Sequence, residues 1–313
     1  LPPWEREMRA AVAVASSVAL AVSGAAAGSL AGSKPHIVFV MQDDLGHHDI
    51  GWNNEAMLPV SHNISALAWS GIVLTNHLVH FHCSPTRRSF ISGRLPLHHG
   101  EGLSGVATDD VDLRWTLIAG KLKAGGYATH WIGKGHTGYM SVNHLPTRRG
   151  FDSFLGFLSG SQDYYSGNLW EDEGPFGNGS DVYSTERFGD RAVDIINSHP
   201  AGTPLFMYLA WQAVHSPYSP VPQWDGNTTA YAPYPGVYAG MIYDADVYTG
   251  RLVGALRARG LWDRTLLVYS SDNGGVSENG LAGNNYPLRG EKHSNWRGGM
   301  RVAAFVAGGV VPA

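Results

Sequence analysis

Four apolar runs of the sequence are each followed directly by side chains that can bind ions or transfer protons. The runs are 36–41, 127–132, 204–211 and 265–270, and the side chains after them are Asp43 and Asp44, Lys134 and His136, His215, and Asp272 and Asn273, respectively. The carboxyl ends of parallel strands lie at one edge of a sheet, where open α/β sheets bind their ligands. If the four runs are parallel strands, these side chains meet in one crevice.

The oxygen-bearing side chains of this set favour a hard cation. Asp43, Asp44 and Asp272 are carboxylates and Asn273 is an amide, and oxygen ligands suit Ca²⁺ or Mg²⁺ better than a soft metal. Three carboxylates this close would repel one another unless a cation lay between them. A two-zinc centre needs more histidines than this part of the sequence offers.

The single cysteine stands in CSPTRRSFISGR (83–94) and has no partner for an internal disulfide. Ser84 suits the N-cap of a short helix, Pro85 its first position and Gly93 its end. Cys83 would then lie at the positive end of that helix, with Arg87 one turn further on and directed back toward it. These surroundings would lower the pKa of the thiol, which is unlike an inert core cysteine.

The same pocket would hold a sulfate or phosphate group, because helix N-termini and basic side chains bind such anions. Lys134 and Lys292 could add positive charge there. The net charge of the whole chain is −4, so the composition gives no broad basic surface for nucleic acid or for an anionic membrane.

The apolar runs alternate with helical patterns, which is typical of an α/β fold. Helices are expected over 114–124, 185–197 and 237–259. In the last of these, Asp244 and Asp246 fall outside the apolar face, and we expect both in solvent.

The N-terminal region is typical of a secretory signal. Met8 and Arg9 precede an Ala-rich apolar run that is too short and too Ser-rich for a stable membrane span. We expect cleavage near residues 27/28; a poorly ordered Ala-rich tail is the alternative. The sequons at Asn63, Asn178 and Asn227 fit the secretory pathway. The predicted division is 1–33 for the extension and signal, and 34–313 for a catalytic domain.

Cys-x-Pro-x-Arg followed by SFISGR resembles the signature of the type I sulfatases. Further segments fit that family in its order along the chain: MQDDLGHHDIG, HLPTRRGFDSFLGFLSGSQDYYS, YLAWQAVHSP, SDNGG and YPLRGEKHSNWRGGMRV. The stretch 144–166 is most similar to arylsulfatase B and the related arylsulfatases I and J. The resemblance implies an alkaline-phosphatase-like fold, a three-layer α/β/α sandwich around a large, mostly parallel, mixed sheet.

The resemblance also implies a cofactor and a modification. A formylglycine-generating enzyme would convert Cys83 to formylglycine. One Ca²⁺ would be bound by five residues, namely Asp43, Asp44, Asp272, Asn273 and the modified Cys83.

The family's other roles fall on basic side chains of this sequence. Arg87 would steady the formylglycine hydrate, and Lys134 and Lys292 would bind sulfate oxygens. His136 would contact the hydrate and assist its deprotonation or its collapse. His215 would lie near the leaving-group oxygen as a candidate general acid.

The function that follows is a sulfatase, a sulfuric ester hydrolase of the arylsulfatase type, in the lysosome or outside the cell. Its substrates would be aryl sulfates or sulfated carbohydrates of the glycosaminoglycan type, with N-acetylgalactosamine 4-sulfate as one candidate. Two alternatives stay open: a phosphoester or phosphonate hydrolase of the same superfamily, and a truncated, non-catalytic binder of sulfated glycans.

Two departures from the family pattern stand out. GKGHTG (133–138) replaces Gly-Lys-Trp-His-Leu-Gly, so Gly135 lacks a ring that we expect to support the loop. The chain ends at residue 313, where the family continues into a smaller C-terminal sheet domain. We therefore expect a catalytic domain that is truncated at its C-terminus.

Overall fold

A nine-stranded mixed sheet organises the computed structural model, which describes residues 34–99, 110–177, 182–219, 221, 236–278 and 280–312. Contacts group Pro35–Val311 into one compact unit. The predicted leader over residues 1–33 and the sequons at Asn178 and Asn227 lie outside the described residues.

The strands run in the order β2-β9-β8-β1-β7-β3-β4-β5-β6 across the sheet. Their bounds are β1 His36–Gln42, β2 Ile72–Val73, β3 Ala128–Lys134, β4 Ser153–Phe157, β5 Trp170–Glu171, β6 Gly174–Pro175, β7 Leu205–Ala210, β8 Thr265–Ser271 and β9 Ala304–Ala307. The central strands from β8 to β4 pair in parallel, and the strands at both edges pair antiparallel.

All four predicted strands are confirmed as β1, β3, β7 and β8. They are direct neighbours in the sheet, in the order β8-β1-β7-β3, and all are parallel. Their carboxyl ends therefore lie at one edge, which is the arrangement that the sequence predicts for the site residues.

The helices have bounds close to those expected in two cases of three. They are α2 His62–Trp69, α3 Cys83–Ser92, α4 Pro96–His99, α5 Ile118–Ala124, α6 Ser184–Ser198, α7 Gly236–Ala258 and α8 Arg297–Met300, with 3₁₀ turns η1 Glu55–Val60, η2 Val142–His144, η3 Pro146–Arg149 and η4 Trp262–Arg264. The helix expected from residue 114 begins only at Ile118. The Asp112 carboxylate accepts the backbone N–H of Arg114 at 2.8 Å, and such local turns compete with a helix start.

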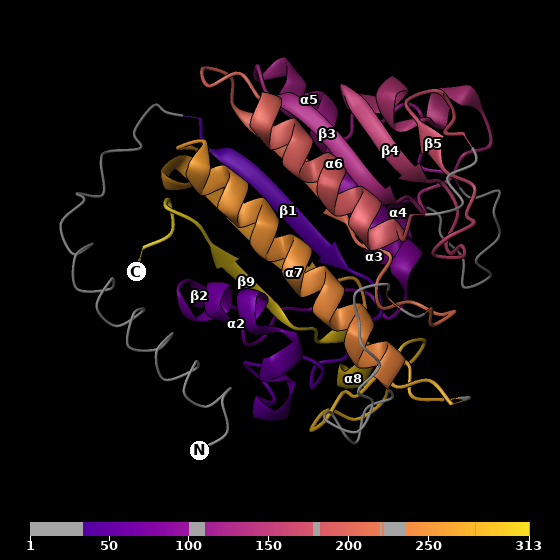
Figure 1. Cartoon of the computed structure of the whole chain (residues 1–313). Helices are drawn as coiled ribbons and strands as arrows, with labels where there is room; N and C mark the ends of the chain where they lie inside the picture. The colour runs from indigo at the N-terminus through magenta and orange to yellow at the C-terminus, as the bar shows by residue number, and fades with distance from the viewer. Residues whose placement is uncertain are drawn as a thin grey trace. The chain divides into compact units, whose positions relative to one another are not determined.

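Both faces of the sheet are covered, because successive strand residues point to opposite sides. Val38 and Val40 of β1 belong to the core that contains Met241 of α7. Met41 and Trp131 belong to a second core on the other face, together with Ile91 of α3. Figure 1 shows α6 and α7 side by side across the near face of the sheet. The three-layer α/β/α prediction is confirmed.

The predicted solvent exposure of Asp244 and Asp246 is wrong, since both side chains are buried. Asp246 accepts the backbone N–H of Asn63 at 3.1 Å and that of Ile64 at 2.7 Å, near the start of α2. It also accepts the Asn63 side-chain amide at 2.8 Å, so the acceptor nitrogen of that sequon is engaged within the fold. An acidic side chain from α7 thus caps the N-terminus of a different helix.

Replacing this cap should lower stability. We expect Asp246→Ala to reduce the free energy of unfolding by about 2 kcal/mol, because it leaves two helix N–H groups without an acceptor. Urea denaturation measures the change. Asp190→Ala, which removes a half-exposed partner of Arg251, is the control and should cost under about 1 kcal/mol. Equal losses in the two variants would contradict the capping role.

Among the described residues, none of the helices combines the length and the apolar composition that a membrane crossing requires.

Candidate active site

Helix α3 places Cys83 at its first position. The predicted cap is wrong by two residues: the N-cap is His82, and the Ser84 hydroxyl lies 3.2 Å from the His82 ring instead of capping the helix. Pro85 still lies in the first turn, where its missing N–H costs nothing. Gly93 ends the helix in the left-handed conformation (φ 68°), as expected. The predicted position of Cys83 at the positive end of a helix is therefore confirmed.

The Cys83 thiol is buried, with only 1% of the residue exposed. Burial by itself would raise the pKa of this thiol. Lys134 and Lys292 lower it, and hydrogen bonds to the His136 and His82 rings lower it further, so its pKa lies well below its usual value. A core cysteine in apolar surroundings would shift in the opposite direction. Cys83 is thus buried and also set in a pocket that stabilises negative charge.

Asp43 and Asp272 converge on Cys83 from the ends of β1 and β8. One ligand atom from each of these three residues lies within 4.8 Å of the other two. Asp44 turns toward the same place through a left-handed backbone (φ 59°), and its N–H donates to Asp272 at 3.2 Å. The acidic residues predicted from two segments more than 200 residues apart are therefore adjacent in space.

Three basic side chains neutralise these carboxylates. Lys134 Nζ lies 2.6 Å from Asp43 Oδ2, and Lys292 Nζ lies 2.7 Å from Asp44 Oδ1. Arg87 pairs with Asp272 at 2.8 Å. All of these side chains are buried or nearly so, which makes the pairs strong because little water screens them.

The oxygen atoms left over fit a hard cation. Within the described part of the chain, Asp43 Oδ1 and Asn273 Oδ1 are buried and accept no hydrogen bond, and an orphaned buried oxygen indicates a missing partner. Burial and the neighbouring Asp272 raise the pKa of Asp43, a cost that a cation between the carboxylates would relieve. Oxygen donors of this kind match Ca²⁺ or Mg²⁺.

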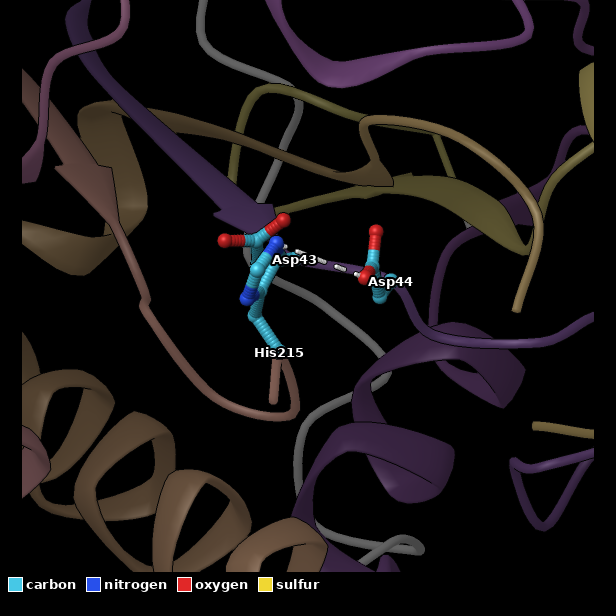
Figure 2. A group of neighbouring side chains, drawn as sticks. All are labelled: Asp43, Asp44 and His215. Atoms are coloured by element: carbon cyan, nitrogen blue, oxygen red, sulfur yellow. Dashed lines mark ion pairs between the residues drawn. The ribbon is translucent and has the colours of Figure 1, made fainter. Parts of the chain in front are cut away.

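His215 follows β7 and faces the acidic cluster. Figure 2 shows its ring beside Asp43 and its contact with Asp44, at 3.7 Å between Nε2 and Oδ2, which becomes an ion pair only when the ring is protonated. Its Nδ1 lies 2.5 Å from the Ser216 carbonyl, which assigns the proton of the neutral ring to Nδ1. Burial, with Lys134 adding to the effect, lowers the pKa of His215 to about 4. The ring is neutral at neutral pH, and its Nε2 is a proton acceptor in the free protein.

The loop after β3 has Gly135 in place of a tryptophan ring, and backbone hydrogen bonds hold it. The Gly135 N–H donates to Phe157 at 2.8 Å and the His136 N–H donates to Leu158 at 3.1 Å. A Cβ at position 135 would lie 2.9 Å from the Phe157 carbonyl oxygen, so this backbone course requires glycine there. Hydrogen bonds to β4 and to the segment after it thus hold the loop at this glycine.

The sequence reasoning missed two histidines near the thiol, one that contacts it and one that packs on the first. The His82 ring lies 3.8 Å from the Cys83 sulfur, and the His293 ring packs on it at 4.9 Å between centroids. Adjacency to Cys83 in the sequence could have identified His82. Adjacency to Lys292 could likewise have identified His293, although the sequence does not show the hydrogen bond from its N–H to the Phe81 carbonyl at 2.8 Å.

Comparison with known proteins agrees with this geometry. The family model described as "Sulfatase" matches residues 35–309. The chain belongs to the sulfatase family. It is 35% identical to Arylsulfatase J of Mus musculus over 293 residues, which cover 88% of this chain and 48% of that protein.

Solved structures confirm the sulfatase fold. The chain resembles Ps i-CgsB, solved in complex with k-i-k-neocarrahexaose, with a TM-score of 0.78 and 30% identity over 88% of this chain and 66% of that one. A protein of the alkaline phosphatase superfamily from Vibrio parahaemolyticus shares the fold, with a TM-score of 0.54 and 17% identity over 88% of this chain and 60% of that one. The sulfatase chain spans about half the length of the curated relatives it matches.

Proposed function

We propose that this chain hydrolyses sulfate esters through a formylglycine made from Cys83. The observation that carries the proposal is the convergence of Asp43 and Asp272 on a buried cysteine of low pKa. A helix N-terminus with basic neighbours binds anions readily. A thiol placed there loses its proton readily and becomes an anion itself. The match of the family model to residues 35–309 supports the modification by a formylglycine-generating enzyme.

The proposed reaction is covalent catalysis in two steps. One hydroxyl of the formylglycine hydrate attacks sulfur, and the bond between sulfur and the alcohol oxygen breaks. The second hydroxyl then loses its proton, the carbonyl re-forms and sulfate leaves. His136, which hydrogen-bonds the Cys83 sulfur, is placed to take that second proton.

The basic residues bind and orient the sulfate group. Lys134 and Lys292, each within ion-pair distance of the acidic cluster, would reach the sulfuryl oxygens and stabilise the charge that develops there. Arg87 holds Asp272 in place and would steady the hydrate. Ca²⁺ bound by Asp43, Asp44, Asp272, Asn273 and the modified Cys83 would stabilise negative charge on the hydrate and on the sulfuryl oxygens.

We propose His215 as the proton donor to the leaving oxygen, with one condition set by its environment. The free protein holds this ring neutral, so it must gain a proton when substrate binds. The negative charge of the sulfate ester beside the ring raises its pKa and favours that uptake.

The two alternatives are less well supported. A two-zinc phosphoester hydrolase needs several histidines, yet the groups of described residues that could hold a metal ion include one histidine, His215. A non-catalytic glycan binder would have no use for a cysteine of lowered pKa beside three carboxylates.

We propose sulfated carbohydrates of the glycosaminoglycan type, or aryl sulfates, as substrates. The similarity to Arylsulfatase J and to a protein solved with a carrageenan hexaose supports this class. N-acetylgalactosamine 4-sulfate remains our candidate, on the sequence likeness over 144–166. The Ala-rich segment before residue 28 supports passage through the secretory pathway to the lysosome or the cell exterior.

Removal of the cation tests the proposal. We expect hydrolysis of 4-methylumbelliferyl sulfate by chain co-expressed with a formylglycine-generating enzyme. A calcium chelator should reduce the rate at least about 100-fold, because the carboxylates then repel both each other and the substrate. Added Ca²⁺ should restore the rate. A rate that is insensitive to the chelator would rule out the cation, and absence of hydrolysis by fully modified protein would rule out the reaction.

A further inference from the structure

A cleft of about 820 Å³ opens between the edge of the sheet formed by β4, β5 and β6 and the loop after β3. Its volume lies within the roughly 300–1,000 Å³ that is usual for small-molecule sites. The residues that line it are Tyr139, Leu158, Ser159, Ser166, Gly167, Asn168, Leu169, Trp170, Pro175, Phe176 and Gly177. In Figure 1, β4 and β5 lie beside β3 at this edge.

The cleft adjoins the proposed active site through His136. The His136 N–H donates to the carbonyl of Leu158, a lining residue, at 3.1 Å. A Cβ on Gly160, which follows the lining residue Ser159, would lie 2.7 Å from the His136 ring. The cleft is therefore placed to receive a part of the substrate that extends away from the reacting sulfate.

No charged side chain is found among the described residues that line the cleft. The Arg187 guanidinium packs on the ring of the lining residue Phe176, 5.2 Å from its centroid, but the lining itself offers an anionic group only neutral groups in place of the water that it would lose. The cleft therefore differs from the neighbouring pocket, where Lys134, Lys292 and Arg87 collect positive charge.

The lining has the side chains that bind a sugar ring. Tyr139, Trp170 and Phe176 offer aromatic faces and edges, and these pack against the apolar C–H face of a pyranose. Ser159, Ser166 and Asn168 offer hydroxyl and amide groups for the sugar hydroxyls. Tyr139 is 45% exposed, so a ligand can reach its ring without a rearrangement of the fold.

We propose that this cleft binds an uncharged sugar residue next to the sulfated one. The proposal rests on the proposed function and narrows its substrate class. The sulfated residue is linked at this position to a hexose or an N-acetylhexosamine, so that among glycosaminoglycan-type chains those with a neutral sugar beside the sulfated residue are favoured over those with a uronic acid. The specificity is set by Tyr139 and Trp170, which do not touch the reacting atoms.

Three substrates test the proposal, namely a sulfated monosaccharide, the same residue extended by an uncharged hexose, and the same residue extended by a uronic acid. We expect the uncharged extension to lower KM about tenfold, the gain of one well-packed aromatic contact, and the uronic acid to give no gain. Tyr139→Ala and Trp170→Ala should each abolish the gain, with kcat nearly unchanged. In both variants the rise in KM should be confined to the substrate with the uncharged extension. Hydrolysis of 4-methylumbelliferyl sulfate, which has no extension, then measures the reaction itself.

One control variant and one alternative test variant keep the test decisive. Trp69→Ala removes an aromatic side chain that is 58% exposed on α2, and should leave the gain intact. Because Trp170 also packs against the core, Tyr139→Ala decides the matter if Trp170→Ala fails to fold. An uncharged extension without effect on KM, or an equal preference for the uronic acid, would overturn the proposal.

Binding of an unsulfated, uncharged disaccharide separates this proposal from the reaction. Ligand-observed NMR should detect binding to the wild-type chain and its loss in Tyr139→Ala. This result is expected even if the chain hydrolyses no sulfate ester. Binding that is unchanged in Tyr139→Ala, or absent from the wild-type chain, would count against the cleft and not against the proposed reaction.

Discussion

Cys83→Ser should retain the first half of the reaction and lose the second. A serine hydroxyl can attack sulfur, but the resulting sulfate ester has no geminal hydroxyl whose deprotonation could expel sulfate. We expect turnover of 4-methylumbelliferyl sulfate to fall at least about 1,000-fold, because the nucleophile is consumed in one cycle. The basic residues that would hold the sulfate group, Lys134 and Lys292, remain in place.

The mass of the variant protein measures the trapped intermediate. After incubation with substrate, Cys83→Ser should gain one sulfo group on the peptide that contains residue 83. Cys83→Ala is the matched control, because it has no hydroxyl and should gain nothing. Multiple turnovers by Cys83→Ser, at a rate close to that of the modified wild type, would show that formylglycine is unnecessary.

Lys134→Ala should reduce both stability and activity. Its ammonium group lies 2.6 Å from Asp43, with both side chains fully buried. Its removal leaves the buried Asp43 beside Asp272 with only a longer ion pair to Arg87, at 3.8 Å, and we expect a loss of about 3 kcal/mol in the free energy of unfolding, measured in chelator. Added Ca²⁺ should reduce this loss, because the cation would supply positive charge to the same carboxylate.

The activity of Lys134→Ala should fall by about 100-fold or more in kcat/KM, as expected when one group that stabilises developing charge is removed. Lys123→Ala is the matched control, since Lys123 forms a pair of nearly equal length with Asp152, 2.7 Å, but on the surface. That pair should contribute at most about 1 kcal/mol and nothing to activity. Equal effects of the two substitutions would contradict the role given to Lys134.

The sequence predicts which residues meet at the candidate site because the fold brings strand ends together in a regular way. The runs that became β1, β3, β7 and β8 are buried strands with apolar side chains, so their pattern is clear. Parallel pairing then places Asp43, Lys134 and Asp272 at one edge without any knowledge of loop structure. The position of Cys83 follows from local signals, chiefly Pro85 and Gly93 at the two ends of α3.

The sequence predicts less where a residue depends on a distant partner. Asp246 has the spacing of a solvent-facing residue, yet it is buried because α2 presents its free N–H groups to α7. Gly135 stands where the family pattern has a tryptophan ring, and only the structure shows that backbone hydrogen bonds to β4 and the segment after it hold this loop. His293 reaches the His82 ring from a segment more than 200 residues away along the chain. The uncharged cleft likewise depends on segments whose spacing has no periodic pattern.

The dependence of activity on the modification of Cys83 tests the central claim most directly. Preparations that differ in the extent of modification would be digested, and mass spectrometry would give the fraction of residue 83 that is formylglycine. Hydrolysis of 4-methylumbelliferyl sulfate in Ca²⁺ should rise in proportion to that fraction and vanish where the cysteine is unmodified. Equal activity in unmodified protein, or no activity in fully modified protein, would contradict the account.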